Sequence, residues 1–364
     1  MKLKHGIASP STITRMLCGI DEELALYAFM EWIGEIADSK NTHLAIDGKA
    51  LRGATEKTKG GTTPMLLNVV DTVRGLIFAQ LPVDSKTNEI GVIPELLKLL
   101  DIKGSVITID AIGTQTAIME QIHEQEGHFV LTVKKNQPEA YEEIHRFMDQ
   151  LEAEEAKTKT DEIPDAVIRE YLEKYEETNR IEKNRDRNEY RVCQICNDTS
   201  NLTKTQKEWR HVQSIGRIKQ IRIPIEKDSQ GNDVTPTKEE FLEKGSRRVP
   251  APSAEEGIGK DIQCTALSSD LILTAEELGT IKRMHWSIEN RLHHVLDDTF
   301  REDRSPAKKS RTNLSLIRKF AYNILRLAMY ETGMTNIMTE MMDCFCDNAA
   351  LREQYVFQGI ASLY

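Results

Sequence analysis

The stretch His43-Leu-Ala-Ile-Asp47-Gly-Lys-Ala-Leu-Arg52 joins a short apolar run to an acid, a glycine and two cations. A second apolar run, Val106-Ile-Thr-Ile-Asp110, also ends on an acid. Short runs of this kind predict buried strands, so both acids are expected at strand ends. A third acid, Glu289, lies in His285-Trp-Ser-Ile-Glu-Asn290 on a predicted helix. Carboxylates placed in this way suit a site that holds hard divalent cations for phosphodiester chemistry.

The segments around the first two acids alternate between strand and helix patterns. Three strands joined by short turns are followed by two strand–helix units, which is the strand order of the ribonuclease H-like fold. In that order the first and fourth strands are neighbours, so Asp47 and Asp110 can converge on one ion. We expect an α/β protein with a mixed sheet flanked by helices. The predicted strands are 44–47, 65–70, 75–81, 106–110 and 128–133, and the predicted helices are 88–100 and 114–126.

Further along, the pattern changes and then returns to the core. The stretch from Glu226 to Gly259 is rich in glycine, proline and charge, and predicts a loop. Strand-like runs at 189–195, 209–215 and 219–224 predict a β-rich insertion. The predicted organisation is a helical N-terminal remnant (1–40), the first part of the catalytic core (41–140), a β-rich insertion before the last catalytic helix (141–262), the completion of the core (263–330) and a helical C-terminal tail (331–364).

Two late helices are predicted from caps and apolar spacing. Thr274-Ala-Glu-Glu277 has the pattern of a capping box, and the helix that follows carries Glu289 at the border of its apolar stripe. A second helix, Asn313 to Glu331, is expected to bury one apolar face. That face comprises Leu314, Ile317, Ala321, Ile324, Leu325 and Ala328.

Composition is that of an ordinary globular protein, with 29% charged and 39% hydrophobic residues. No apolar run approaches a membrane span and no signal peptide is recognisable, so we expect a cytoplasmic protein. The net charge of -10 argues weakly against a nucleic-acid partner. Basic residues nonetheless cluster, which fits either separate DNA-contacting strips or a surface of mixed charge. Cys193 and Cys196 have zinc-like spacing, but their surroundings favour a strand without metal.

Each acid also has a structural interpretation. Asp47 before a glycine is often a turn residue, Asp110 could cap the next helix, and helical glutamates such as Glu289 usually form surface ion pairs. Trp286 could stack on a base or complete the core. The joint placement of the acids favours function. The DNA-binding candidates are Lys49, Arg52, Lys134, Lys135, Asn136, Gln137, His285, Trp286, Asn290, His293, Arg304, Lys308 and Lys309.

The blocks around Asp47, Asp110 and Glu289 resemble the H repeat-associated branch of the DDE transposases of bacterial insertion sequences. The third block, His-Trp-Ser-Ile-Glu-Asn-Arg-Leu-His-His-Val-Leu-Asp-Asp-Thr-Phe-Arg-Glu-Asp, is the most specific. The resemblance covers about residues 41–330. It implies that the three acids are the catalytic and metal-binding triad, with Mg²⁺ as cofactor and Mn²⁺ as a substitute. It also implies cut-and-paste transposition, terminal inverted repeats and target DNA as partners, and a homodimer in the DNA complex.

Two departures from the family are visible. Family members usually carry a longer helical region before the first acid, which predicts a truncated N-terminus here. His294 stands where a tryptophan is common. Three functions remain open: a transposase working at the nucleoid, a metal-dependent nuclease of the same fold, and a non-catalytic DNA-binding remnant of a decaying element.

Overall fold

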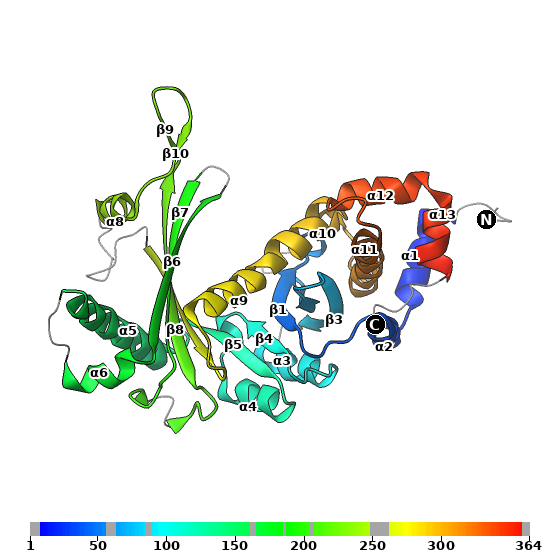
Figure 1. Cartoon of the computed structure of the whole chain (residues 1–364). Coiled ribbons are helices and arrows are strands. Elements are labelled where there is room, and N and C mark those ends of the chain that lie inside the picture. Colours follow the sequence, from blue (N-terminus) through cyan, green and yellow to red (C-terminus); the bar gives the residue numbers. More distant parts are fainter. Residues whose placement is uncertain are drawn as a thin grey trace. The chain divides into compact units, whose positions relative to one another are not determined.

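The structure is a computed structural model of the whole chain (Figure 1). The chain forms two compact units. The first unit combines residues 1–127 with 284–364, and the second comprises residues 128–283. The structure describes residues 8–55, 63–83, 89–160, 165–184, 187–203, 207–247 and 262–358.

The first unit contains a mixed sheet with the strand order β3-β2-β1-β4. β1, β2 and β3 are antiparallel neighbours, whereas β1 and β4 run parallel. This arrangement confirms the predicted α/β, ribonuclease H-like fold. Leu44, Ala45 and Ile46 of β1 are all buried, as expected of a central strand covered on both faces. The strands are β1 (His43–Ala50), β2 (Met65–Asp71), β3 (Leu76–Val83) and β4 (Val106–Ile109).

Three helices of the first unit, α1, α2 and α13, begin at a residue whose side chain caps them. The Asp21 side chain accepts hydrogen bonds from the backbone N–H groups of Glu23 and Leu24, which starts α2. Asn88, the first residue of the helix predicted over 88–100, lies outside the described residues. The helices are α1 (Pro10–Gly19), α2 (Glu22–Ile36), η1 (Arg52–Ala54), α3 (Glu89–Lys98), η2 (Ala111–Gly113), α4 (Thr116–Glu124), η3 (Glu289–His293), α10 (His294–Asp298), η4 (Glu302–Arg304), α11 (Arg311–Thr332), α12 (Met338–Asp347), α13 (Ala349–Arg352) and η5 (Glu353–Gln358).

Helix α9 (Ala275–Ile288) begins in the second unit and ends in the first. Its N-terminus has the predicted capping box: Glu277 N–H donates to Thr274 Oγ1, and Thr274 N–H donates to Glu277 Oε2. The chain continues through η3 and α10 as one helical run with a π-helical turn in it.

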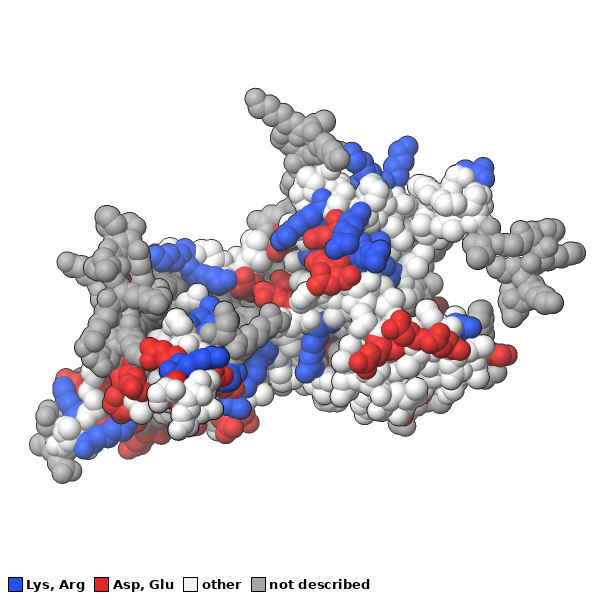
Figure 2. Space-filling view, turned by 90° about the horizontal axis from the view of Figure 1, so that it is seen from above, with Lys and Arg blue, Asp and Glu red and all other residues white. Residues whose placement is uncertain are grey.

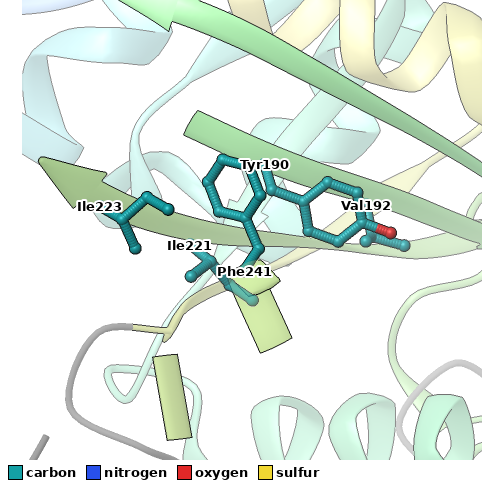
Figure 3. Packing of buried hydrophobic residues seen from close by; sticks show 5 residues of the cluster. All are labelled: Tyr190, Val192, Ile221, Ile223 and Phe241. Carbon is teal, nitrogen blue, oxygen red and sulfur yellow. The ribbon is translucent and has the colours of Figure 1, made fainter. Parts of the chain in front are cut away.

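The second unit is an antiparallel sheet in the order β5-β11-β8-β7-β6, with helices against it. Phe241 of α8 packs on Tyr190, Val192, Ile221 and Ile223, which forms a compact apolar cluster (Figure 3). The elements are β5 (His128–Val133), α5 (Pro138–Thr158), α6 (Ala166–Leu172), β6 (Tyr175–Asn184), β7 (Arg187–Cys196), β8 (Ser214–Pro224), β9 (Glu226–Lys227), β10 (Asp233–Val234), α8 (Lys238–Arg247) and β11 (Ile262–Ser269).

Several local predictions were wrong. β1 continues to Ala50, so Asp47 lies inside a strand and not at its end. The predicted loop from Glu226 contains α8, because Phe241 supplies an apolar anchor that the polar composition hid. The two strands expected within 209–224 are one strand, β8.

Cys193 and Cys196 lie on β7 and are buried free thiols, as the strand interpretation predicted. No helix in the described part of the chain has the length and apolarity that a membrane crossing requires.

Candidate active site

The parallel pair β1–β4 places the first two acids beside each other. Its register runs from His43 opposite Val106 to Ile46 opposite Ile109, so the next step along both strands brings Asp47 level with Asp110. Neighbouring strands lie ~4.8 Å apart. Asp110 has extended backbone angles at the start of η2, and its side chain makes no capping hydrogen bond there. The capping interpretation of Asp110 was therefore wrong.

The helical run that carries Glu289 is fixed to the same two strands. His285 Nδ1 lies 3.0 Å from Thr108 Oγ1, which in turn lies 3.2 Å from His43 Nε2. Side chains two residues apart on a strand share a face, so Thr108 and Asp110 face the helix together. Glu289 follows His285 by four residues, one helical turn, and so lies on the same side of the helix.

A π-helical turn begins at Glu289, where the N–H of His294 donates to the Glu289 carbonyl. Such turns are rare and occur often at functional sites, because they change the direction of the side chains that follow. On this turn His293 Nδ1 comes within 3.7 Å of Asp47 Oδ2. One side of the helical run thus contacts both strands of the parallel pair.

The electrostatics of Asp47 show that the acids are close together. Burial, together with the charges of Asp110, Glu289 and Glu89, raises the pKa of Asp47 to about 7. A hydrogen bond of 2.9 Å from the Gly48 N–H to Asp47 Oδ1 opposes this shift. Two carboxylates crowded in one partly buried place resist ionising together, and one pKa rises as a result.

The donor set has the chemistry of a hard-cation site but is not assembled as one. Carboxylate oxygens are the ligands that Mg²⁺ prefers. However, among the described residues no group of three or more His, Cys, Asp or Glu side chains is arranged so that it could hold a metal ion. A cation would therefore need side-chain rotations to draw in its ligands. It would also favour the charged form of Asp47, which burial and the neighbouring acids disfavour.

Glu89 is a fourth acid that sequence reasoning missed. It is the first residue of α3, and burial together with the charge of Asp110 raises its pKa. Gly48 makes room for it: a Cβ at Gly48 would lie 2.7 Å from Glu89 Oε1. The Asp47-Gly48 pair lies within β1 and does not form a turn, and a side chain at position 48 would displace the flexible Glu89 carboxylate. No signal in the sequence pairs residue 48 with residue 89.

His293 is neutral in this environment. Burial and the nearby charges of Lys49 and Lys319 lower its pKa to about 3. The contact with Asp47 is consequently not an ion pair. Its other ring nitrogen, Nε2, is buried without a hydrogen-bond partner.

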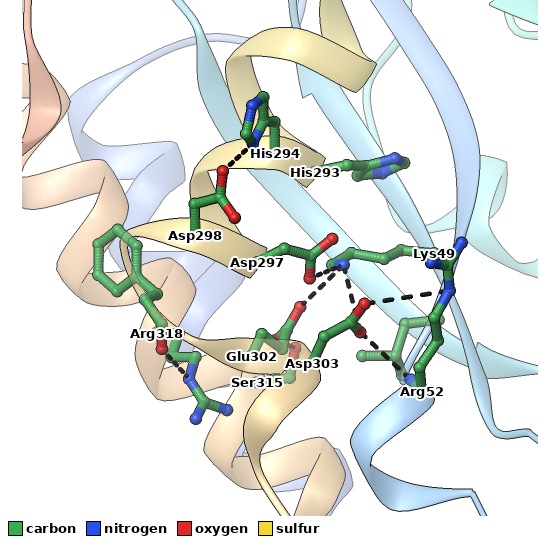
Figure 4. A network of polar contacts seen from close by, with 12 residues as sticks. Lys49, Arg52, His293, His294, Asp297, Asp298, Glu302, Asp303, Ser315 and Arg318 are labelled. Atoms are coloured by element: carbon green, nitrogen blue, oxygen red, sulfur yellow. Dashed lines mark hydrogen bonds and ion pairs between the residues drawn. The ribbon is translucent and has the colours of Figure 1, made fainter.

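Lys49, one of the predicted DNA-binding residues, is buried among three acidic side chains (Figure 4). Its side chain is only 5% exposed, and its Nζ lies 2.5 Å from Asp297, 3.7 Å from Glu302 and 4.0 Å from Asp303. A buried ammonium held by three carboxylates cannot reach a phosphate without losing them. Lys49 instead fastens β1, two residues beyond Asp47, to α10 and η4.

The acid cluster around Lys49 continues into the core. The Ser315 hydroxyl donates to Glu302 Oε1 at 2.7 Å, and Lys319 donates to the Ser315 hydroxyl and to Gln80. Burial lowers the pKa of Lys319 to about 8. Polar groups in such a network are satisfied only together, so it fixes one arrangement of β1, β3 and α11.

The remaining DNA-binding candidates fall into three groups. His285 is buried against Thr108, and its contact with DNA stays a prediction. Trp286, His293 and Gln137 are half-buried. The others are exposed: Arg52, Asn290, Arg304, Lys308 and Lys309 in the first unit, and Lys134, Lys135 and Asn136 after β5 in the second. His294, where the family often has tryptophan, is 57% exposed and pairs with Asp298.

On the face that Figure 2 shows, Lys and Arg side chains lie among Asp and Glu side chains. The acidic net charge therefore does not produce a uniformly negative surface.

A profile of the family described as "Transposase DDE domain" matches residues 38–324, which is most of the chain and includes all three acids. The chain belongs to the DDE transposase family. This confirms the resemblance stated from the sequence.

Individual relatives agree with the family. YbfL of Escherichia coli K12 is 28% identical over 328 residues, which is 88% of this chain and 74% of YbfL. YhhI of the same strain, named as a candidate H repeat-associated transposase, is 28% identical over 329 residues, with the same coverage of 88% and 74%. Among solved structures, a piggyBac transposase synaptic complex with hairpin DNA gives a TM-score of 0.37 at 11% identity. The match covers 98% of this chain and 66% of that one, and at this TM-score it says nothing further about this chain.

Proposed function

We propose that this DDE transposase cuts DNA strands at the ends of an insertion sequence and joins the freed 3′ hydroxyl to target DNA. The observation that carries the proposal is that Asp110 and Glu289 lie close enough to Asp47 for their charges to raise its pKa, which burial also raises. Two of these acids are level on parallel neighbouring strands, and all three are coupled through the raised pKa of Asp47. Acids that crowd at such a cost to stability are typical of functional sites.

We propose Mg²⁺ as the cofactor, with Mn²⁺ able to replace it. Asp47, Asp110 and Glu289 would hold the cation through their carboxylates. When bound, it would polarise the reacting phosphodiester and neutralise charge that develops there. Glu89 lies close enough to influence the site through its charge, since Asp110 raises its pKa.

The other residues of the site would position the acids. The hydrogen-bonded chain of His43, Thr108 and His285 holds the helix against β4. Lys49 holds β1 against α10 and η4. Neutral His293 sits beside Asp47 without adding charge.

The test is a cleavage and joining assay on a plasmid that carries the inverted repeats flanking the gene. We expect strand cleavage and joined products with Mg²⁺ or Mn²⁺, and neither product with EDTA or with Asp110→Asn. Asp101→Asn is the matched control, because Asp101 is an exposed acid that pairs with Lys40. Equal activity in the wild type and Asp110→Asn would refute the enzymatic function.

The same assay separates the other functions. Cleavage without joined products would assign a metal-dependent nuclease. Binding to the repeats without cleavage would assign a non-catalytic remnant. Transposition requires two ends to be held together, so we also propose a homodimer on DNA. Light scattering of the complex with end DNA measures its mass and tests this. An activity on chromosomal DNA would place the protein at the nucleoid.

A further inference from the structure

The strands β6, β7 and β8 of the second unit present two chemically different faces. One face carries Tyr190, Val192 and Ile221, and α8 covers it through Phe241. The other face is rich in arginine. We call the following five residues the arginine face: Arg180 on β6, Arg187 and Arg191 on β7, Arg222 on β8, and Arg283, which reaches the same place from α9.

Strand register proves that these side chains share a face. Residues directly opposite in an antiparallel pair point to the same side. Arg180 lies opposite Arg191, and Glu189 lies opposite both Glu182 and Arg222. Alternation then places every second residue of each strand with them and sends Lys183, next to Glu182, to the other face.

Two glutamates organise the arginine face. The Glu189 side chain is 1% exposed. Its carboxylate lies 2.7 Å from the guanidinium of Arg187, 2.5 Å from that of Arg191 and 3.6 Å from that of Arg222. Burial alone would raise the pKa of Glu189, but the surrounding arginines lower it.

Glu182 holds the rest of the arginine face. Arg180, Arg191 and Arg283 each approach its carboxylate to 2.9 Å. Strand alternation places one more acid, Glu176, on this side, because it lies opposite Ile195. Five arginines against three glutamates leave a net charge of +2 on this face, in a chain whose net charge is -10.

The arginine face is accessible and its donors exceed its acceptors. Arg180 is 65% exposed, Arg187 41%, Arg283 44% and Arg222 37%. A guanidinium has five N–H donors, whereas each glutamate offers two oxygens. The exposed guanidinium groups of Arg180, Arg187 and Arg283 can therefore approach an external partner. Because the glutamates already hold the arginines in place, the arginine side chains would lose little entropy when a partner binds.

We infer that the arginine face binds the sugar-phosphate backbone of duplex DNA. Guanidinium groups match phosphate oxygens in pairs. The described residues that point to this side of β6, β7 and β8 include no aromatic side chain, and single-stranded DNA would need one for base stacking. The inference rests on the proposed function, since it assigns a second contact surface for the same substrate.

The test measures how the affinity of the full chain for a labelled 30-base-pair duplex depends on salt, in EDTA to prevent cleavage. We compare the wild type with Arg180→Gln/Arg283→Gln, which leaves the buried Glu189 cluster intact. Removing one arginine–phosphate interaction lowers the slope of log affinity against log salt by about 0.9, so the double substitution should lower it by about 1.8. The affinity at 0.1 M salt should fall roughly eightfold for each of the two arginines replaced.

Two controls isolate the arginine face. Lys174→Gln/Lys183→Gln removes two charges that are similarly exposed and ion-paired in the same unit, and it should leave the slope near that of the wild type. Arg180→Lys/Arg283→Lys keeps the charge and should preserve most of the slope. A thermal melt of each variant confirms folding.

The outcomes separate the two proposals. Wild-type binding with an unchanged slope in Arg180→Gln/Arg283→Gln overturns the inference and leaves the proposed function standing. An equal change of the slope in Lys174→Gln/Lys183→Gln also overturns the inference. So does a change of the slope that appears with a duplex RNA probe of the same length but not with the duplex DNA. A wild type that binds no DNA refutes the proposed function itself.

Discussion

The surroundings of Asp47 strongly disfavour its charged form. Its folded pKa of about 7 lies above the ordinary aspartate value of 3.8. An acid with a raised folded pKa contributes its full stability below pH 3.8. It loses that contribution as the pH rises towards 7, because the unfolded chain ionises first. Without a cation, neutral pH should therefore weaken the protein at this position.

We expect Asp47→Asn to be more stable than the wild type at pH 8 in EDTA, by about 1–3 kcal/mol. The amide keeps the acceptor for the Gly48 N–H and removes the buried charge. The gain should vanish near pH 4, where both states of the wild type are protonated. Urea denaturation at the two pH values measures it, with Asp101→Asn as the exposed control. A variant less stable than the wild type at pH 8 would contradict the raised pKa of Asp47.

Lys49 tests the opposite situation, a buried charge that is needed. We expect Lys49→Met to lower the free energy of unfolding by about 3–5 kcal/mol, because Asp297 and Glu302 would lose their cation. Arg52→Met is the matched control. The Arg52 side chain is 81% exposed, so the change should stay within about 0.5 kcal/mol. Urea denaturation of both variants decides the matter, and similar small losses would show that the network around Lys49 contributes little.

These two residues show what the sequence could and could not predict about the site. Asp47 and Asp110 were predictable because each ends an apolar run. Asp47 follows His43 by four positions and Asp110 follows Val106 by four positions, which matches the parallel register of β1 and β4. The burial of Lys49 could not be predicted, because the three acids that surround it lie about 250 residues further along the chain. Glu89 had no sequence signal for the same reason. Short-range patterns place residues on elements, whereas only the packed fold pairs them.

At the scale of elements, α11 shows how an apolar pattern can mislead. The predicted buried stripe included Ile317, which is 44% exposed. The buried side instead includes Asn323, whose side chain bonds both the N–H and the carbonyl of Ile77. β3 is the edge strand of its sheet in the first unit, so its backbone needs polar partners. A helix that covers a sheet edge must supply polar partners for the backbone of that strand. Its buried face therefore contains polar residues and does not show an apolar sequence pattern.

The two interpretations of α11 predict different costs of substitution. We expect Asn323→Leu to cost about 2–4 kcal/mol, because two buried backbone groups lose their partners. Ile317→Ala, by contrast, should cost less than about 1 kcal/mol on a half-exposed surface. Thermal and urea denaturation of the two variants compare them directly. A larger loss for the isoleucine would favour the apolar stripe over the edge contact.

At the scale of the whole molecule, buried neutral histidines in both units set the response to acid. Burial lowers the pKa of His43 and of His145 to about 4, and burial with nearby lysines lowers that of His293 to about 3. A histidine with a lowered folded pKa contributes its stability above pH 6.5 and loses it as the pH falls towards 4. Asp47 acts in the opposite direction over the same range.

The magnitudes decide which effect dominates. Between pH 7.5 and pH 5 each histidine should cost about 2 kcal/mol, and Asp47 should return about as much as one of them. We therefore expect a net loss of roughly 4 kcal/mol in EDTA, measured by urea denaturation at the two pH values. His145→Gln should reduce the loss, since it removes one titrating group from the second unit and leaves Asp47 untouched. A stability that stays level or rises from pH 7.5 to pH 5 would mean that these imidazoles accept protons without opening the fold.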